Sequence, residues 1–154
     1  MKRRLVVTCA ATLLVAFIAA TAAAADQIQG QVMGAGAPIA NSTVMLWAAT
    51  ADAPKQLGQA KTGADGSFAL NASAVPANAT LYLVAKGGRT SKASDDNPAI
   101  ALLTVLGNKP PAKVTINEFT TIASVWTHNQ FIDGTAIRGQ PLGLRIAAMK
   151  LTVQ

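Results

Sequence analysis

The residues of this sequence best suited to chemistry lie in one short stretch, where Thr121, Ser124 and His128 are spaced three and four apart. On a helix, this spacing places all three side chains on one face. A hydroxyl beside a histidine is the pattern of an activated nucleophile, which also needs a carboxylate to orient the histidine. Glu118 and Asp133 both fall near the opposite, apolar side of such a helix. We therefore expect His128 to be an exposed surface residue, and we predict no catalytic residues and no enzyme activity.

A second group of candidates is the acidic run Asp95, Asp96 and Asn97. Its oxygen atoms are of the kind that Ca²⁺ prefers, but the spacing of an EF-hand loop is absent. The chain has one histidine and one cysteine, whereas a zinc centre needs several such ligands. We therefore predict a solvated acidic loop, with no metal and no other cofactor.

Aromatic residues are a third group, because flat rings stack on sugars and peptides. They are few in this chain, and scarce aromatic residues usually serve the core. We expect Trp126 to pack against the rest of the fold and Trp47, on the less buried face of its strand, to be more exposed. The candidate ligand-contact residues are therefore Trp47, Asp95, Asp96 and Asn97.

The first 25 residues have the three-part pattern of a secretory signal peptide. Basic residues at positions 2–4 precede an apolar run at 5–18, and small residues then lead to Ala25. The alternative is an uncleaved anchor, since residues 5–25 are nearly long enough to span a bilayer. We expect cleavage near Ala25 and a bacterial protein that is exported to the periplasm or the cell surface.

Removal of residues 1–25 changes the charge and the cysteine content. Of thirteen Lys and Arg, three leave with this segment, so ten remain against seven Asp and Glu, a net charge of +3. The remaining basic residues are scattered, which argues against nucleic-acid binding. Cys9 is also removed, so the mature chain forms no internal disulfide. Its roughly 130 residues suffice for one domain with its own core, and we expect no membrane contact after cleavage.

Seven segments of the mature sequence have the composition of β-strands: residues 27–33, 43–48, 55–61, 66–71, 79–86, 99–106 and 113–117. Residues 99–106 are also compatible with a short buried helix. In 79–86 apolar residues occupy both faces, as in a strand covered on both sides. We predict a mainly β protein, a small antiparallel β-sandwich over residues 27–117.

The turn before the fourth strand has the clearest sequence signal. Gly63 and Gly66 accommodate positive φ angles, and Asp65 caps its own backbone. Phe68 and Leu70 then alternate toward the interior. We expect these turn residues to be structural, with Asp65 shaping the turn instead of binding an ion.

After residue 117 the apolar period changes. Phe119, Ile122 and Trp126 form one stripe of an amphipathic helix, with Asn117 as a plausible N-cap and an end near residue 133. A second short helix is predicted at 142–149. We expect the apolar stripe to face the sandwich, in a helical extension that covers residues 118–154.

The strand and turn segments resemble the carboxypeptidase regulatory-like family. The matching pieces are IQGQV at 28–32, APIANSTV at 37–44, TGADGSF at 62–68 and LYLVA at 81–85. The family consists of transthyretin-like sandwiches related to the B-type repeats of bacterial adhesins, and the resemblance covers about residues 27–86. Ser42 departs from the family's common small residue.

Segments 101–107 and 114–121 resemble a region that follows such domains in uncharacterised exported bacterial proteins. Those chains usually continue well past the equivalent of Ala148, so the resemblance implies a truncated copy.

The function that we expect is structural or adhesive, in a non-enzymatic module of the cell envelope. Its partner would be an envelope protein or a polysaccharide. A carbohydrate- or peptide-binding module is the alternative. A transthyretin-like hydrolase is a third, weaker one, because such enzymes depend on His, Arg and a C-terminal Ser/Tyr-rich motif that this sequence does not match.

Overall fold

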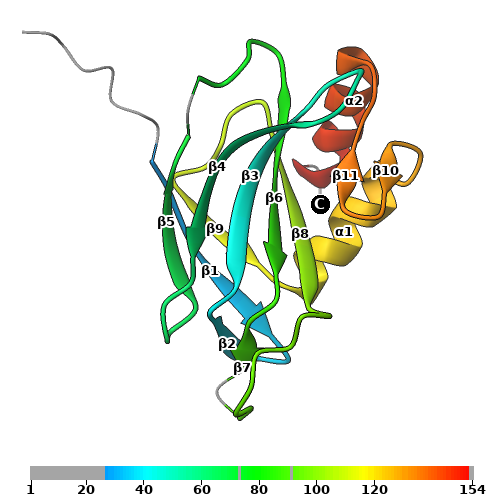
Figure 1. Ribbon diagram of the computed structural model, residues 1–154. Helices are drawn as coiled ribbons and strands as arrows, with labels where there is room; N and C mark the ends of the chain where they lie inside the picture. The colour runs from blue at the N-terminus through cyan, green and yellow to red at the C-terminus, as the bar shows by residue number, and fades with distance from the viewer. Residues whose placement is uncertain (1–26, 73, 91, 153–154) are drawn as a thin grey trace, which may run out of the picture.

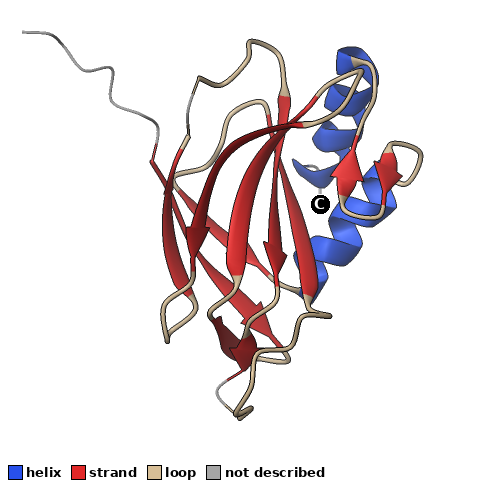
Figure 2. Cartoon of the chain, viewed as in Figure 1, coloured by secondary structure: helices blue, strands red, loops and turns tan. Residues whose placement is uncertain are grey.

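A computed structural model describes residues 27–72, 74–90 and 92–152. The proposed signal peptide therefore lies outside the described residues. Figures 1 and 2 show two β-sheets and a layer of helices on one side of them. In chain order the elements are β1 (Gln27–Gly34), β2 (Ala37–Ala40), β3 (Thr43–Ala49), β4 (Lys55–Lys61), β5 (Ser67–Asn71), β6 (Thr80–Lys86), β7 (Arg89–Thr90), β8 (Ala101–Gly107), β9 (Lys113–Ile116), α1 (Glu118–His128), β10 (Ile132–Asp133), β11 (Ala136–Ile137) and α2 (Pro141–Thr152).

The two large sheets have simple orders. The β1 sheet runs β5–β1–β2–β7, and β9 pairs with β1 as well. The β3 sheet runs β4–β3–β6–β8, and all its neighbours are antiparallel. The β1–β9 pair is parallel, with Val32 opposite Ile116. The prediction of a small, mainly β sandwich with a C-terminal helix is confirmed.

The core lies between the two sheets because alternate residues of each strand point inward. Val44 and Leu46 of β3 are fully buried there, beside Leu81 and Leu83 of β6. The β1 sheet contributes buried residues from β1, β2, β5 and β9: Ile28, Val32, Ile39, Phe68, Leu70 and Ile116.

A second apolar cluster covers the other face of the β3 sheet. Tyr82 and Val84 of β6 point into it, so β6 is buried on both faces as predicted. Ile137 of the β10–β11 hairpin and Leu144 of α2 close this cluster from outside. The hairpin is tied to the sheet because the Tyr82 hydroxyl accepts a hydrogen bond of 3.2 Å from the Ile137 amide. Burial raises the pKa of Tyr82.

The segment after α1 differs from the prediction. The helix ends at His128, not near residue 133, because the chain turns into the β10–β11 hairpin. Phe131 lies in this connection and packs against α2, where a Cβ on Gly143 would be 2.9 Å from the Phe131 ring. The absence of a side chain at Gly143 therefore permits this close packing. The short strands β2 and β7 lie outside the seven predicted strand segments.

The turn at residues 63–66 has the expected form. The Asp65 carboxylate accepts hydrogen bonds from the Ser67 amide at 3.0 Å and the Ser67 hydroxyl at 2.7 Å. These bonds hold the pKa of Asp65 below its usual value. Gly66 has φ +74, and a Cβ there would be 2.6 Å from the Val32 carbonyl oxygen. Asp65 thus acts on the backbone of its own turn.

Candidate functional site

The polar face of α1 lies against β8, the edge strand of the β3 sheet. Thr121 Oγ1 accepts a hydrogen bond of 2.9 Å from the Leu103 amide, and Ser124 Oγ accepts one of 3.0 Å from the Val105 amide. The Thr120 hydroxyl donates a hydrogen bond of 3.3 Å to the Leu103 carbonyl oxygen. An edge strand has backbone groups that no neighbouring strand pairs. The helix hydroxyls take the place of that missing strand.

The first turn of α1 is held from both sides. The Asn117 side chain accepts from the Thr120 amide at 2.9 Å, and Thr120 Oγ1 accepts from the Asn117 amide at 3.0 Å. This reciprocal cap confirms Asn117 as the N-cap. The Glu118 carboxylate accepts from the Ala35 amide in the β1–β2 turn, which lowers the pKa of Glu118. The orientation of α1 about its axis is therefore fixed at its start.

His128 lies on the same inward face and is fully buried. Its Nδ1 is 2.9 Å from Thr127 Oγ1. The Thr127 hydroxyl also lies 2.9 Å from the Ala123 carbonyl oxygen, to which it donates. Nε2 makes no hydrogen bond with a described residue. Burial lowers the pKa of His128, and the backbone of Ser124 and Leu144 offsets part of that effect.

The expectation of an exposed His128 is wrong, because the polar face of α1 is the face that packs on the sheet. The same packing argues against a nucleophile at Ser124, whose side chain is buried and whose oxygen is bonded to the Val105 amide. The histidine nitrogen that makes a hydrogen bond is engaged with Thr127, not with Ser124. These residues position a helix.

The opposite faces of both helices carry large apolar side chains that point to solvent. We call this surface the outer apolar face. Each of its six side chains is between 52% and 79% exposed. They are Phe119, Ile122 and Trp126 of α1 with Leu142, Ile146 and Met149 of α2. The prediction that the α1 stripe faces the sandwich is therefore wrong, and Trp126 is among the most exposed residues instead of a core residue.

The predicted ligand-contact residues do not form one site. The acidic loop closes on itself and on its neighbours: Asp96 pairs with Arg89 at 2.9 Å, and Asn97 accepts from the Ala99 amide at 2.9 Å. Asp95 accepts from the Ser94 hydroxyl at 2.9 Å. Trp47 lies elsewhere, half-buried on the helical side of the β3 sheet.

Trp47 lines a pocket of about 210 Å³ with Pro54, Tyr82 and Thr135. The expectation that Trp47 is the more exposed of the two tryptophans is thus also wrong. Trp47 packs instead against the cluster that Ile137 of the hairpin and Leu144 of α2 close.

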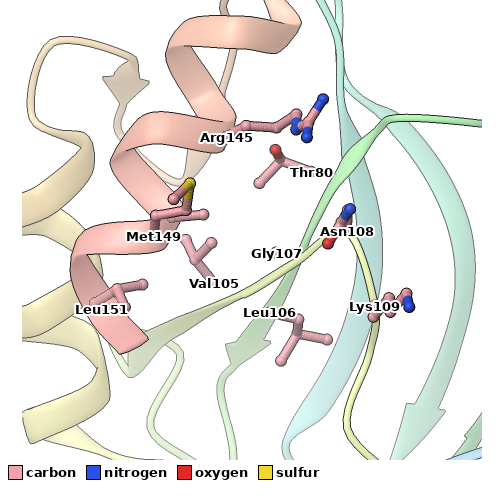
Figure 3. A pocket seen from close by; sticks show the side chains of 10 residues that line it. Thr80, Val105, Leu106, Gly107, Asn108, Lys109, Arg145, Met149 and Leu151 are labelled. Atoms are coloured by element: carbon pink, nitrogen blue, oxygen red, sulfur yellow. The ribbon is translucent and has the colours of Figure 1, made fainter. Parts of the chain in front are cut away.

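A pocket of about 350 Å³ opens between α2 and the adjoining ends of β6 and β8 (Figure 3). Thr80 contributes a buried hydroxyl that has no hydrogen-bond partner in the described part of the chain. Arg145 and Lys109 supply cationic groups at the wall. Asn108 lies between them in Figure 3. Val105 and Leu151 supply apolar lining. The mixture suits a small molecule with an apolar body and an anionic group.

Residues 27–72, 74–90 and 92–152 meet the requirements of neither a metal site nor a membrane-spanning helix. No group of three or more His, Cys, Asp and Glu residues is placed to hold a metal ion. No helix of this part has the length and hydropathy needed to cross a membrane.

Comparisons with known proteins leave the family open. No protein-family model and no curated protein matches the chain. Among solved structures, it is similar to a 9R-lipoxygenase from Cyanothece PCC8801, with 18% sequence identity and a TM-score of 0.37. That likeness covers 60% of this chain and 15% of the lipoxygenase chain.

Sequence reasoning missed the outer apolar face because it assigned the apolar stripe to the interior. The available signal was the density of hydroxyls on the other face of α1, at positions 120, 121, 124 and 127. Ser and Thr side chains can bond free backbone groups, so a hydroxyl-rich face is compatible with contact to a sheet edge.

The edge contact predicts a stability cost at Ser124. Ser124→Ala leaves the buried Val105 amide without its acceptor, and such a loss costs about 1–3 kcal/mol of unfolding free energy. Chemical denaturation of the mature protein measures it. Thr115→Ala, at an exposed position of β9, is the control and should change stability by about 0.5 kcal/mol or less. Equal effects of the two substitutions would contradict the edge contact.

His128 predicts a pH dependence of stability. Because its pKa is lowered in the folded protein, the unfolded chain binds a proton first as the pH falls. Stability is therefore full above the unfolded pKa of about 6.5 and decreases below it, by at most about 1.4 kcal/mol per pH unit. The decrease in unfolding free energy ends once the pH is below the pKa of His128 in the folded protein. Thermal unfolding between pH 8 and 5 measures this for the wild type and for His128→Gln, which lacks the slope; parallel curves would disprove the assignment.

Proposed function

We propose that this chain is an exported, non-enzymatic β-sandwich module with a structural role in the bacterial cell envelope, where it is held in an assembly through its outer apolar face. The observation that carries this proposal is the exposure of Phe119, Ile122 and Trp126 on α1 beside Leu142 and Ile146 on α2. The two helices pack against each other, and each carries its own exposed apolar stripe.

The size of this surface supports a docking role. Aromatic side chains bury about 150–250 Å² each when fully covered, so Phe119 and Trp126 leave on the order of 300 Å² in water. The four aliphatic side chains, each more than half exposed, add a comparable area. The largest apolar patch on a typical monomer is about 300–600 Å². Covering the excess stabilises a complex by the hydrophobic effect, at about 25 cal/mol per Å² before the costs of association.

The rest of the chain supports a structural role over a catalytic one. The hydroxyls of Thr121 and Ser124 bond the edge of β8, and His128 is buried beneath them. The resemblance of residues 27–86 to carboxypeptidase regulatory-like and adhesin B-type sandwiches supports an envelope setting. The leader pattern of residues 1–25 supports export.

The pocket beside α2 favours a second candidate function, a carbohydrate-binding module. Its wall brings Arg145 and Lys109 together with the Asn108 amide and the Thr80 hydroxyl. Salt bridges among the described residues engage Arg89 and Arg138 but neither of the two pocket cations. A sugar with a carboxylate matches that chemistry, because guanidinium binds carboxylate through paired hydrogen bonds.

The main proposal predicts contact through the helices in the living cell. The photoreactive residue p-benzoylphenylalanine, placed at Phe119 in the exported protein, should give covalent adducts on irradiation. The matched control is Ala69, which is exposed on β5 at the far face of the sandwich. Adducts at Phe119 and not at Ala69 support the proposal. Equal yields at both positions, or none at either, would contradict it.

The second candidate predicts a preference for acidic sugars. Addition of glucuronate, but not of glucose, should shift the amide NMR signals of Gly107 and Asn108 at millimolar concentration. Arg145→Gln should weaken this response by about tenfold or more, as expected when a charged hydrogen bond is lost. Arg138→Gln, remote from the pocket, is the control. Identical responses to both sugars, or to neither, would exclude this binding mode.

A further inference from the structure

We infer that the partner of the outer apolar face is a second copy of this chain, paired about a twofold axis. The α1 and α2 helices of both copies would then form a four-helix layer between two sandwiches. This inference rests on the proposed function, since it names the occupant of the same surface.

The area of the face matches what a pair of identical chains needs. Stable interfaces of standard size bury roughly 800 Å² on each partner. The six side chains of the outer apolar face expose an area of that order. In a twofold pair each copy contributes the same patch, so one patch of this size on each chain completes the interface.

The shape of the face also favours a two-helix partner. On α1 the exposed residues Phe119, Ile122 and Trp126 recur every three or four positions, opposite the sheet-facing Ser124. On α2 Leu142 and Ile146 lie opposite the buried Leu144. Each of the two packed helices thus carries one apolar stripe. A second pair of helices covers both, as in the four-helix arrangements in which apolar stripes meet at a common core.

The charges around the face permit self-pairing. The six side chains are uncharged, and the nearest ionised groups on the helices are Glu118, Arg145 and Lys150, one acid and two bases. Superposed identical patches therefore bring no like charges together at their centre. Glu118 is already bonded to the Ala35 amide.

The surface of a membrane is a poorer occupant. Helices that lie in a bilayer interface keep a strongly charged or polar face in water. In α1 the polar face, with Ser124 and His128, is buried against the sheet instead. The exposed apolar stripes are therefore better suited to a second protein surface.

The oligomeric state of the purified, processed protein tests the inference. Light scattering coupled to size exclusion, at tens of micromolar chain, should give the mass of two chains. Ile122→Glu places a charge in the centre of the interface and should weaken the pairing by at least about 100-fold, because an unpaired charge is costly to bury. Ala69→Glu, on the exposed side of β5, is the control and should leave the dimer intact. Both side chains are exposed in the single chain, so unfolding temperatures report whether each variant folds.

A cysteine series locates the contact. The only cysteine of the sequence is Cys9 in the leader, so a single cysteine introduced in the mature chain reports on one position. Under mild oxidation Ile122→Cys or Leu142→Cys should give disulfide-linked pairs, whereas Ala69→Cys should stay monomeric. Pairs at the helix positions support the inference, and pairs at Ala69 alone contradict it.

The remaining outcomes separate this inference from the proposed function. A dimer that Ile122→Glu does not weaken, or a chain that stays monomeric at millimolar concentration, would overturn self-pairing. If a monomeric chain still gives Phe119 adducts with other proteins in the cell, the structural role stands and the partner is a different protein. If it instead floats with vesicles of phosphatidylethanolamine and phosphatidylglycerol, the occupant is a membrane, and if it does neither, both proposals fail.

Discussion

The free edge of β8 is the constraint from which the rest of the helical layer follows. Its outward amides at Leu103 and Val105 need acceptors once they are removed from water, since an unpaired buried donor is costly. Thr121 and Ser124 of α1 provide those acceptors. A helix with apolar residues on this side would cover the edge without satisfying it. The hydroxyl-rich face is therefore inside, and these two amides of β8 are not available to pair with another chain.

This choice determines what the helices present to solvent. Once the polar face of α1 is committed to the sheet, Phe119, Ile122 and Trp126 must point outward. It also carries His128 into the interior, where burial lowers its pKa. An amphipathic helix usually hides its apolar stripe. Here the hydrogen bonds of one strand edge outweigh that tendency, and the apolar stripe becomes available for a contact between molecules.

The sandwich and the helical segment each contribute a separate apolar cluster. The sandwich of β1–β9 has its own core between two sheets, which includes Val44, Leu46 and Leu83. The segment from α1 to α2 adds a second cluster on the outside of the β3 sheet, joined to it by Tyr82 and Leu144. A self-sufficient sandwich that carries a helical layer with an apolar exterior is suited to hold an assembly together. That division supports the proposed structural role. The pocket beside α2 lies where the helical segment meets the sandwich.

The sequence by itself determined the elements whose pattern reflects only local geometry and burial. Alternation in β1 and β3, the turn at Asp65 and Gly66, the doubly buried β6 and the Asn117 cap all depend on period and turn chemistry. The short strands β2 and β7 and the β10–β11 hairpin are too brief to give a period. Only the tertiary structure decided which face of α1 is inside. The same spacing defines an apolar stripe and a hydroxyl stripe, and the choice between them depends on an unpaired strand edge that lies distant in the sequence.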